Sequence, residues 1–450
     1  MGRLFGTDGA RGVAITELTC ELAMQIGRAA ALVLSKNPKH KRPKILVGKD
    51  TRISSDVLEA ALVAGITSVG TDVELLGVVP TPAVAYLVKY YEADAGVMIS
   101  ASHNSVEYNG IKLFSNTGFK LPDEVENEIE ALILDKPSEI PLKDGCDIGK
   151  VTVMYGAGTE YIEHLERTVD KRFNGLMVAI DCANGSASET AEALFTKLGV
   201  DCRMLSHRPD GCNINDNCGS THLESLQQYV IEHGCDFGVA FDGDADRCLA
   251  VDEKGNVVDG DKLIAVISRF MRDSRTLKND AAVVTVMSNL GFHNYMRKNN
   301  IKTVCAKVGD RYVLEEMLKG GYNIGGEQSG HIIFLDHATT GDGQLTAVQL
   351  MNLVATTKTP LSYLVKEIED YPQILVNVKI TADKKGMWGA NEKIQEAIAR
   401  AEKFFGTDGR VLVRESGTEP LVRVMVEGKE KEQVDKWAMQ IANVIKKELS

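Results

Sequence analysis

The chain has 450 residues, of which 44 % are hydrophobic and 25 % are charged, and its formal net charge at pH 7 is −12. A single hydrophobic core rarely grows to this length, so we expect three or four domains of ordinary globular composition. The negative charge argues against a nucleic-acid groove, which needs clustered lysine and arginine. The absence of any run of about 18 apolar residues argues against a membrane-spanning helix.

The N-terminus and the cysteines are typical of a cytoplasmic protein. The start, MGRLFGTDGARG, lacks the apolar core of a signal peptide. Of the nine cysteines, three lie near two histidines in a group that could suggest zinc: Cys202, His207, Cys212, Cys218 and His222. However, no CxxC is present and the intervals fit no common zinc spacing. We therefore expect free thiols in a reducing cytoplasm.

A weak repeat of strands and helices organises the first three quarters of the chain. In the first copy, the hydrophobic pattern predicts strands at 45–47, 73–79 and 95–99 and helices at about 55–69 and 81–91. In the second copy, it predicts strands at 177–180, 200–205 and 237–241 and helices at 187–198 and 222–232. In the third copy, it predicts strands at 282–286, 303–306 and 322–324 and helices at 292–299 and 311–318. This alternation predicts three related α/β domains with parallel or mixed sheets covered by helices.

The pattern changes near residue 371. Strands are predicted at 374–380, 410–413 and 421–426, and helices at 391–405 and 432–448. Such an arrangement is typical of a small α+β domain. We therefore predict four domains, at residues 1–152, 153–255, 256–369 and 370–450.

In α/β sheets, ligands bind beyond the carboxyl ends of the strands, so the segments after the last strand of each copy are candidate sites. They read SASHN, DGDADR and GEQSGH. In the second, Asp242, Asp244 and Asp246 alternate, so in an extended segment their carboxylates point the same way. Carboxylates held close together need a cation, and hard oxygen ligands suit Mg²⁺. A solvated acidic turn would share the pattern, whereas Arg247 stands where an EF-hand loop needs glycine.

The serine loop at residues 100–104 follows the buried strand predicted at 95–99. The hydroxyl of Ser102 is a poor nucleophile until a base, a metal or its own phosphorylation activates it, and the same residue types could simply cap a helix. The loop occupies the position in its repeat that DGDADR occupies in the next, so we expect both loops to open into the same site. A phosphate on Ser102 would then complete the coordination of a three-aspartate metal, and Arg247 would suit a bound phosphate.

Three further groups of polar residues could bind a sugar phosphate. Glu327, Ser329 and His331 lie among glycines and match the hydroxyl-rich face of a sugar, although an ordinary glycine-rich turn would look the same. Near the C-terminus, a loop between two strands combines a guanidinium fork, hydroxyls and backbone N–H groups, which suit a non-reacting phosphate unless the loop is a simple surface hairpin. Its residues are Arg414, Ser416, Gly417, Thr418 and Arg423. Arg11 and Lys112 are cations near glycines that could flank Ser102.

Taken together, these loops resemble those of the α-D-phosphohexomutase superfamily. LFGTDGARG, ASHN with NGIK, DGDADR, GEQSGH and RESGTEPLVR occur in the order of that family along the whole chain. The resemblance implies four domains around a central cleft, with Ser102 as a phosphoserine whose phosphate binds one Mg²⁺ together with Asp242, Asp244 and Asp246. It implies that Glu327 and Ser329 contact sugar hydroxyls and that the loop at 414–418, with Arg423, holds the distal phosphate. The residues implied around the reacting end are Arg11, Lys112, Arg247 and His331, and the proton-transfer residue stays open among Lys112, Arg11 and His331.

The implied reaction interconverts glucosamine 6-phosphate and glucosamine 1-phosphate through a 1,6-bisphosphate, with a hexosamine or hexose 1,6-bisphosphate as activator. GEQSGH and SGTEP favour this branch over one acting on glucose or mannose phosphates, which is the alternative. The implied partner is a phosphosugar, without nucleic acid or membrane, and the chain would be a monomer or a homodimer. Two rivals from other classes are a calcium sensor built on DGDADR and a serine hydrolase, although no GxSxG surrounds Ser102.

Overall fold

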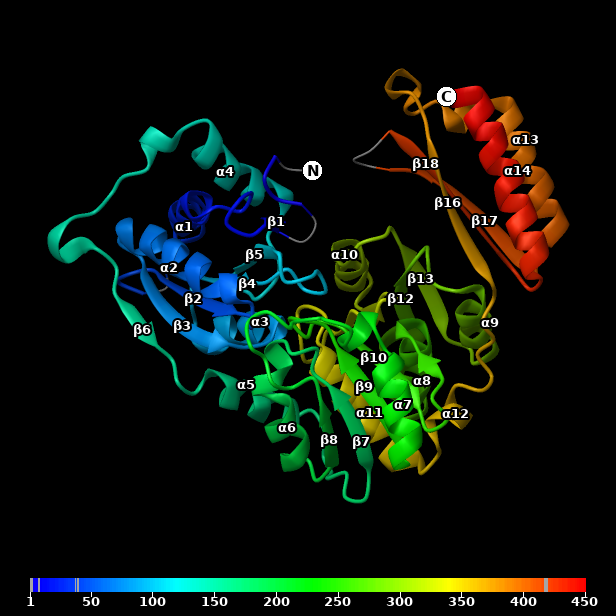
Figure 1. Ribbon diagram of the computed structural model, residues 1–450, viewed down its shortest axis with the longest axis horizontal. Helices are drawn as coiled ribbons and strands as arrows, with labels where there is room; N and C mark the ends of the chain where they lie inside the picture. The colour runs from blue at the N-terminus through cyan, green and yellow to red at the C-terminus, as the bar shows by residue number, and fades with distance from the viewer. Residues whose placement is uncertain (1–2, 7–8, 37, 39, 417–419) are drawn as a thin grey trace. The chain divides into compact units, whose positions relative to one another are not determined.

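In the computed structural model, residues 3–6, 9–36, 38, 40–416 and 420–450 are described. The chain forms two compact units (Figure 1). The first unit comprises Met1–Met287 and Ile301–Val365, and the second comprises Ser288–Asn300 and Lys366–Ser450. Three of the four larger sheets belong to the first unit, and the fourth belongs to the second.

The N-terminal sheet has six strands in the order β1-β5-β4-β2-β3-β6. The strands are β1 (Ala10–Val13), β2 (Lys44–Lys49), β3 (Asp72–Val78), β4 (Ala95–Ile99), β5 (Tyr108–Ser115) and β6 (Val151–Val153). The accompanying helices are α1 (Cys20–Leu34), α2 (Ile53–Ser68), α3 (Thr81–Tyr90) and α4 (Asp123–Leu134). All five residues of β4 are buried, which is expected of a strand covered on both faces.

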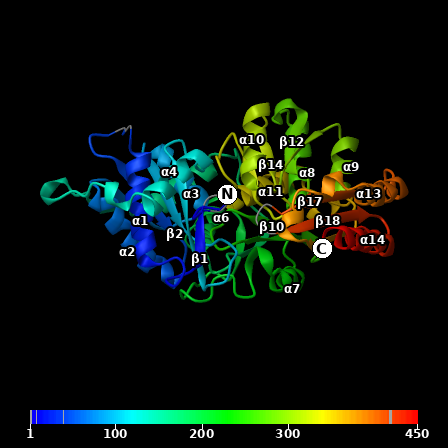
Figure 2. The ribbon, with the colours of Figure 1, turned by 90° about the horizontal axis from the view of Figure 1, so that it is seen from above.

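Helices α1 and α2 lie side by side (Figure 2) and approach closely because glycines face the contact. A Cβ atom at Gly27 would lie 2.4 Å from the carbonyl oxygen of Leu62, and one at Gly65 would lie 2.1 Å from that of Met24. Larger side chains at these positions would therefore force the helices apart. The glycines thus set the packing of this layer against the sheet.

The second and third sheets repeat the same construction. The second has the order β11-β10-β9-β7-β8 and the third the order β13-β12-β14-β15. Their strands are β7 (Met177–Asp181), β8 (Asp201–Leu205), β9 (Phe237–Phe241), β10 (Cys248–Asp252), β11 (Val257–Val258), β12 (Ala281–Thr285), β13 (Lys302–Ala306), β14 (Ile324–Gly326) and β15 (Ile332–Phe334). Their helices are α5 (Ala157–Glu166), α6 (Ala191–Lys197), α7 (Glu224–His233), α8 (Gly260–Asp273), α10 (Asp310–Gly320), α11 (Gly343–Thr357) and α12 (Leu361–Leu364).

Strand pairing confirms the repeat expected from the sequence. The strands β4-β2-β3, β9-β7-β8 and β14-β12-β13 pair in parallel in the same spatial order. In each copy the first of these strands also pairs antiparallel with the strand that follows it in the chain, as β4 with β5, β9 with β10 and β14 with β15. The fold class is therefore the predicted one, with three related mixed α/β sheets. Each of the three motif loops connects the two strands of one such hairpin.

The second unit holds the predicted α+β element. Its sheet has the order β16-β18-β17, with β16 (Gln373–Lys379), β17 (Gly409–Glu415) and β18 (Leu421–Gly428) all antiparallel. Helices α13 (Glu392–Phe405) and α14 (Lys431–Leu449) cover one face of this sheet (Figure 1). Buried Ile394, Val422 and Ile441 belong to the core between them. Helix α9 (Leu290–Lys298) also belongs to this unit.

Several predicted elements differ in their bounds from the observed ones, and three examples lie in the second and third copies of the repeat. The helix expected at 187–198 is a 3₁₀ turn (Ser186–Glu189) followed by α6, because Thr190 leaves the helical region. The helix expected at 222–232 begins at Glu224. The strand expected at 322–324 is instead Ile324–Gly326, because the N–H of Tyr322 still bonds the carbonyl of Met317 at the end of α10. In the part of the chain that is described, no helix combines the length and apolarity that a bilayer crossing requires.

Candidate active site

The three hairpin loops bring the motif residues together within the first unit. The loop after β4 carries Ser102, the loop after β9 carries the three aspartates, and the loop after β14 carries Glu327 and His331. Because β4, β9 and β14 hold equivalent positions in their sheets, each loop leaves its sheet at the same point of the repeat. The sequence pattern predicted this convergence of loops.

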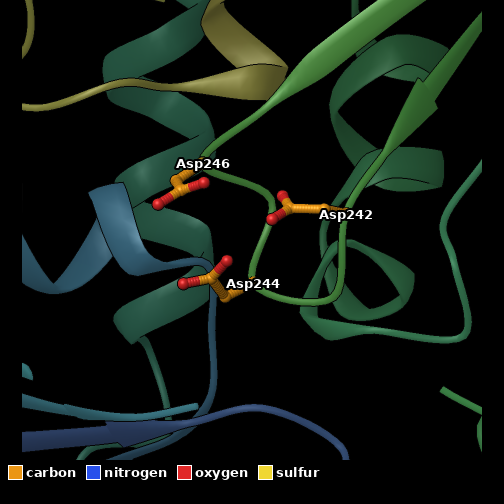
Figure 3. A group of neighbouring side chains, drawn as sticks. All are labelled: Asp242, Asp244 and Asp246. Carbon is orange, nitrogen blue, oxygen red and sulfur yellow. The ribbon is translucent and has the colours of Figure 1, made fainter. Parts of the chain in front are cut away.

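Asp242, Asp244 and Asp246 form a compact acidic cluster (Figure 3). One carboxylate oxygen of each lies within 4.8 Å of the corresponding oxygens of the other two, and all three residues are buried. The loop folds back on itself because Ala245 adopts a left-handed conformation (φ 55°) and its N–H donates to the carbonyl of Asp242 at 3.0 Å. This turn, rather than an extended segment, directs the carboxylates toward one point.

Cations and hydroxyls surround the cluster unevenly. Lys112 Nζ bonds Asp244 Oδ2 and lies 3.4 Å from Asp246 Oδ2. Thr81, at the start of α3, donates through Oγ1 to Asp244 Oδ2 at 2.5 Å. The backbone N–H of Arg247 donates to Asp242 Oδ1 at 3.1 Å. One lysine therefore serves two of the three carboxylates.

The titration of the carboxylates reflects this uneven environment. Burial, with the charges of Asp246 and Asp244, raises the pKa of Asp242 well above its ordinary value. Burial and Asp246 also oppose ionisation of Asp244, but Lys112 and the hydrogen bond from Thr81 together lower its pKa. Burial opposes ionisation of Asp246, whose pKa is nevertheless lowered by Lys112 and His331. A carboxylate with a raised pKa inside an acidic cluster indicates a shortage of positive charge.

The donor set fits a hard divalent cation. Asp244 Oδ1 and Asp246 Oδ1 are buried and have no hydrogen-bond partner among the described residues. Leaving two buried carboxylate oxygens unsatisfied costs free energy unless a ligand binds them. Three carboxylates with oxygen donors within a few ångströms match the chemistry of Mg²⁺. The residues that could hold it are Asp242, Asp244 and Asp246.

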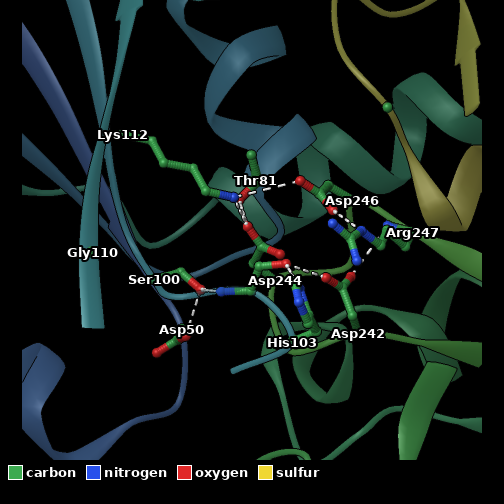
Figure 4. A network of polar contacts seen from close by, with 12 residues as sticks. Asp50, Thr81, Ser100, His103, Gly110, Lys112, Asp242, Asp244, Asp246 and Arg247 are labelled. Atoms are coloured by element: carbon green, nitrogen blue, oxygen red, sulfur yellow. Dashed lines mark hydrogen bonds and ion pairs between the residues drawn. The ribbon is translucent and has the colours of Figure 1, made fainter. Parts of the chain in front are cut away.

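Ser102 lies directly against the acidic cluster. Its Oγ donates to Asp242 Oδ2 at 2.5 Å, and the residue is buried. Its N–H donates to Ser100 Oγ at 3.0 Å, and Ser100 Oγ in turn donates to Asp50 Oδ2 at 2.6 Å (Figure 4). One hydroxyl and three aspartates that are far apart in the sequence therefore meet at one place, as expected.

A pocket of about 140 Å³ opens beside Ser102. Its lining contains six of the residues singled out in the sequence, Asp246 and five others, together with Val308, Gly309 and Asp310. The five are Arg11, Ser102, Arg247, Glu327 and His331. Lys112 contacts the acidic cluster and is not among the residues that line this pocket, whereas Ser329 is exposed on the same loop as Glu327. Gly309 N–H donates to Glu327 Oε1 at 3.1 Å and so fixes that carboxylate at the pocket wall.

His331 is held on both ring nitrogens. Its Nδ1 lies 3.6 Å from Asp246 Oδ2, and its Nε2 accepts a hydrogen bond from the N–H of Gly341 at 3.0 Å. An accepting Nε2 carries no proton, so the ring proton sits on Nδ1 and faces Asp246. This arrangement suits a residue that orients Asp246 better than one that transfers a proton in the pocket.

The expected distal-phosphate residues lie in the second unit. Arg414 on β17 pairs directly across the ladder with Arg423 on β18. Burial and the neighbouring Arg423 lower the pKa of Arg414, and the Nε atoms of both arginines lack a hydrogen-bond partner among the described residues. Two like charges placed opposite each other are unfavourable unless an anion joins them. Ser416 is buried, and its N–H donates to the carbonyl oxygen of Leu421 at 2.9 Å. Gly417 and Thr418 lie outside the described residues.

His103 is among the residues of the site that were not singled out from the sequence. His103 places Nδ1 at 3.2 Å from Ser102 Oγ. Burial, with the nearby charges of Arg247 and Arg11, lowers the pKa of His103 to about 4. Its position next to Ser102 in SASHN was the available signal, but a neighbour in sequence need not point to the same side of the loop.

Comparison with known families agrees with this geometry. Four models of phosphoglucomutase/phosphomannomutase domains match the chain in order: α/β/α domain I at 2–139, domain II at 159–255, domain III at 259–371 and the C-terminal domain at 375–444. The chain therefore belongs to the phosphoglucomutase/phosphomannomutase family, and the family resemblance inferred from the motifs is confirmed.

Within this family, the curated relatives point to one branch. A phosphoglucosamine mutase of Clostridium novyi (strain NT) is 53 % identical over 445 residues, covering 99 % of each chain. That of Bacillus subtilis (strain 168) is 52 % identical over 449 residues, covering 100 % of this chain and 99 % of the relative.

Solved structures share the fold at lower identity. A phosphoglucomutase/phosphomannomutase family protein from Burkholderia thailandensis has a TM-score of 0.81 at 22 % identity, covering 99 % of this chain and 98 % of that chain. An N-acetylphosphoglucosamine mutase from Aspergillus fumigatus, in complex with GlcNAc-6P and magnesium, has a TM-score of 0.68 at 18 % identity. The match covers 100 % of this chain and 96 % of that chain.

Proposed function

We propose that this chain is a phosphosugar mutase, an isomerase that interconverts glucosamine 6-phosphate and glucosamine 1-phosphate, with Ser102 as the phosphoryl carrier. The observation that carries the proposal is the 2.5 Å hydrogen bond from Ser102 Oγ to Asp242 Oδ2, which places a hydroxyl against a buried acidic cluster. Full-length relatives at 52–53 % identity that are named phosphoglucosamine mutase favour this substrate over glucose or mannose phosphates.

The acidic cluster is proposed to hold one Mg²⁺. Asp242, Asp244 and Asp246 would bind it together with the phosphate of Ser102, and the ion would offset negative charge on the transferring phosphoryl group. The unsatisfied oxygens of Asp244 and Asp246 support this assignment. The related A. fumigatus enzyme, whose structure was determined with magnesium, supports it independently.

In the first transfer, phosphorylated Ser102 donates its phosphoryl group to the free sugar hydroxyl. The P–O bond to the serine oxygen breaks, a P–O bond to the sugar oxygen forms, the sugar hydroxyl loses its proton and the serine oxygen regains one. The product is a 1,6-bisphosphate, and return of its other phosphoryl group to Ser102 completes the interconversion. A hexosamine or hexose 1,6-bisphosphate would serve as activator by phosphorylating Ser102.

The proton-transfer residue is sought among the cations beside Ser102. Lys112, Arg11 and His331 are the candidates suggested by the family resemblance. Both ring nitrogens of His331 are engaged, which favours an orienting role for that residue. Arg11 lines the pocket, and His103 joins the candidates because of its distance from Ser102 Oγ. Arg247, also on the pocket wall, is assigned to the reacting phosphate.

The remaining contacts follow from the pocket and the second unit. We assign Glu327 and Ser329 to the sugar hydroxyls, supported by the place of Glu327 in the pocket wall. We assign the non-reacting phosphate to the C-terminal loop, supported by the facing arginines; its residues are Arg414, Ser416, Gly417, Thr418 and Arg423. The nine cysteines are free thiols, which supports a cytoplasmic location.

A coupled assay with glucosamine 6-phosphate, Mg²⁺ and a trace of hexose 1,6-bisphosphate tests the proposal. Wild type should form glucosamine 1-phosphate, whereas Ser102→Ala should lose turnover but still bind substrate, because only the phosphoryl acceptor is removed. Ser138→Ala, which changes an exposed serine of the N-terminal domain, is the control and should match wild type. Turnover by Ser102→Ala at the wild-type rate would overturn the proposal.

A further inference from the structure

Ser102 adopts a backbone conformation that few side-chain-bearing residues tolerate. Its φ is 54°, in the left-handed region. For a residue other than glycine, this conformation costs on the order of 1–2 kcal/mol and persists only where the surroundings enforce it. Since the same conformation aims Oγ at Asp242, the groups that enforce it also aim the proposed phosphoryl carrier.

Arg52 supplies the first of these groups. Its side chain is fully buried and its Nε donates to Asp50 Oδ2 at 2.9 Å. Its Nη2 donates to the carbonyl oxygens of Ser102 at 3.0 Å and of Asn104 at 2.7 Å, and Nη1 donates to that of Ser105. One guanidinium therefore holds three backbone carbonyls of the serine loop.

Asn215 supplies the second group from a different part of the chain. It lies between β8 and α7, and its Nδ2 donates to the carbonyls of both Ser102 and Asn104 at 2.9 Å. The backbone N–H of Asn215 donates to the carbonyl oxygen of Ala183 at 2.9 Å, and the φ of Asn215 is 57°. Each of the two carbonyls thus accepts one hydrogen bond from Arg52 and one from Asn215.

The acidic loop is shaped to allow this arrangement. A Cβ atom on Gly243 would lie 2.5 Å from the carbonyl oxygen of Ser102 and 3.0 Å from Asn215 Nδ2. Any side chain at this position would therefore push the serine loop away from Asp242. The serine loop, the acidic loop and Asn215 therefore meet at the backbone carbonyl of Ser102.

We propose that Arg52 and Asn215 form a clamp on the carbonyls of Ser102 and Asn104 and are positioning residues for phosphoryl transfer. Neither residue contacts the pocket, so they act through the backbone of Ser102. The clamp rests on the proposed function, because it is defined by transfer through Ser102. Asn215 belongs to the β7–β11 segment that carries the metal-binding candidates, so the clamp ties Ser102 to the acidic cluster independently of any bound ion.

The chemistry of each clamp residue makes distinct substitutions informative. A lysine at position 52 keeps the positive charge beside Asp50, but its single ammonium cannot reproduce the planar fork that reaches three carbonyls. An aspartate at position 215 has nearly the shape of asparagine but presents only acceptors to two carbonyl oxygens. Alanine at position 215 removes the donors without adding charge.

The test compares Asn215→Ala with Asn217→Ala. Both asparagines have positive φ (57° and 50°), so the backbone cost of alanine is matched, whereas the Asn217 amide bonds only Asp216 Oδ1 among the described contacts. Purified wild type and variants are assayed for kcat and KM, for melting temperature, and for single-turnover transfer from Ser102 phosphorylated with glucose 1,6-bisphosphate. Asn215→Ala should lose about 10- to 100-fold in kcat and in the transfer rate, because small misplacements of reacting groups carry costs of this size. KM and the Asn217→Ala rates should match wild type.

Arg52→Lys is an independent second variant with the same expected kinetic pattern. If Asn215→Ala does not fold, Arg52→Lys alone tests the clamp. Wild-type kcat and transfer rate in a folded Asn215→Ala or Arg52→Lys would overturn the clamp. A rise in KM with kcat unchanged would overturn it as well, because that result assigns the residues to substrate binding. An inactive wild type would instead contradict the proposed function, so the two failures are distinguishable.

Discussion

At the scale of single residues, Lys112 is a buried cation that contacts two carboxylates of the acidic cluster. It is 3 % exposed, and its ammonium serves two buried carboxylates while a third, Asp242, depends on a serine hydroxyl and a backbone N–H. In the absence of a metal, Lys112 is the side chain that holds Asp244 and Asp246 together. Loss of one partner of a buried pair is costly because the remaining charge stays uncompensated.

Lys112→Met should therefore lower the free energy of unfolding in EDTA by about 3–5 kcal/mol. Mg²⁺ should restore more stability to this variant than to wild type, because the ion replaces the missing positive charge. Urea unfolding with EDTA and with Mg²⁺ measures both effects. Lys120→Met is the control, since Lys120 bonds Asp310 outside the acidic cluster. An equal Mg²⁺ response in the two variants would contradict this assignment of Lys112.

The residues at the site differ in how readily the sequence reveals them. Ser102 and the three aspartates could be predicted because their loops hold equivalent positions in a repeat. Arg52 and Asn215 could not, because they bind carbonyl oxygens, and the path of the backbone through a loop leaves no periodic trace in the sequence. His331 was predicted beside the reacting end, but its contacts with Asp246 and Gly341 depend on a turn that residue types alone do not specify.

At the scale of elements, the residue that directly precedes α11 also contributes to stability. Asp342 caps this helix, accepting from Leu345 N–H at 2.9 Å, and it also accepts from the hydroxyl of Tyr161 at 2.8 Å. Burial raises its pKa from 3.8 to about 7 despite these hydrogen bonds. Between about pH 4 and pH 7 the folded chain therefore holds a proton that the unfolded chain has lost, and this contribution to stability declines as the pH rises.

Asp342→Asn should flatten the pH dependence of stability in that window, because the amide keeps the acceptor oxygen and cannot ionise. The expected difference in slope is up to about 1.4 kcal/mol per pH unit. Denaturant unfolding at pH 4.5, 5.5 and 6.5 measures it. Parallel curves for wild type and variant would show that Asp342 keeps an ordinary pKa in the folded chain.

Strongly buried elements were the most predictable ones. Strands β4 and β9 begin and end where the hydrophobic runs at 95–99 and 237–241 predict. The hairpin partners β5 and β15 were not predicted. The polar and glycine positions of β5 hide the period of a strand, and the three residues of β15 are too few to show one. The predicted boundaries between the four domains stay a prediction.

At the scale of the whole molecule, the division into two compact units has a thermodynamic consequence. The three aspartates, Ser102 and the pocket beside it all belong to the first unit, whereas Ile441 lies in the core of the second. Units with separate cores can unfold in separate transitions. A ligand then stabilises only the unit that binds it.

Calorimetry on wild type and Ile441→Ala tests this expectation. The substitution should destabilise one transition by about 2–5 kcal/mol, as expected for a fully buried isoleucine. Added Mg²⁺ should raise the midpoint of the other transition. A single transition that responds to both changes would show that the two units unfold together.

The threefold hairpin plan also has an evolutionary consequence. Three segments with one strand order carry three different loop sequences, and these loops hold a hydroxyl, a set of carboxylates and a glutamate of the pocket wall. Each loop can change without disturbing its scaffold, because the ladder bonds of the strands lie outside the loops. New chemistry in this lineage is therefore expected to arise by exchange of one hairpin tip at a time, while the framework of strands persists.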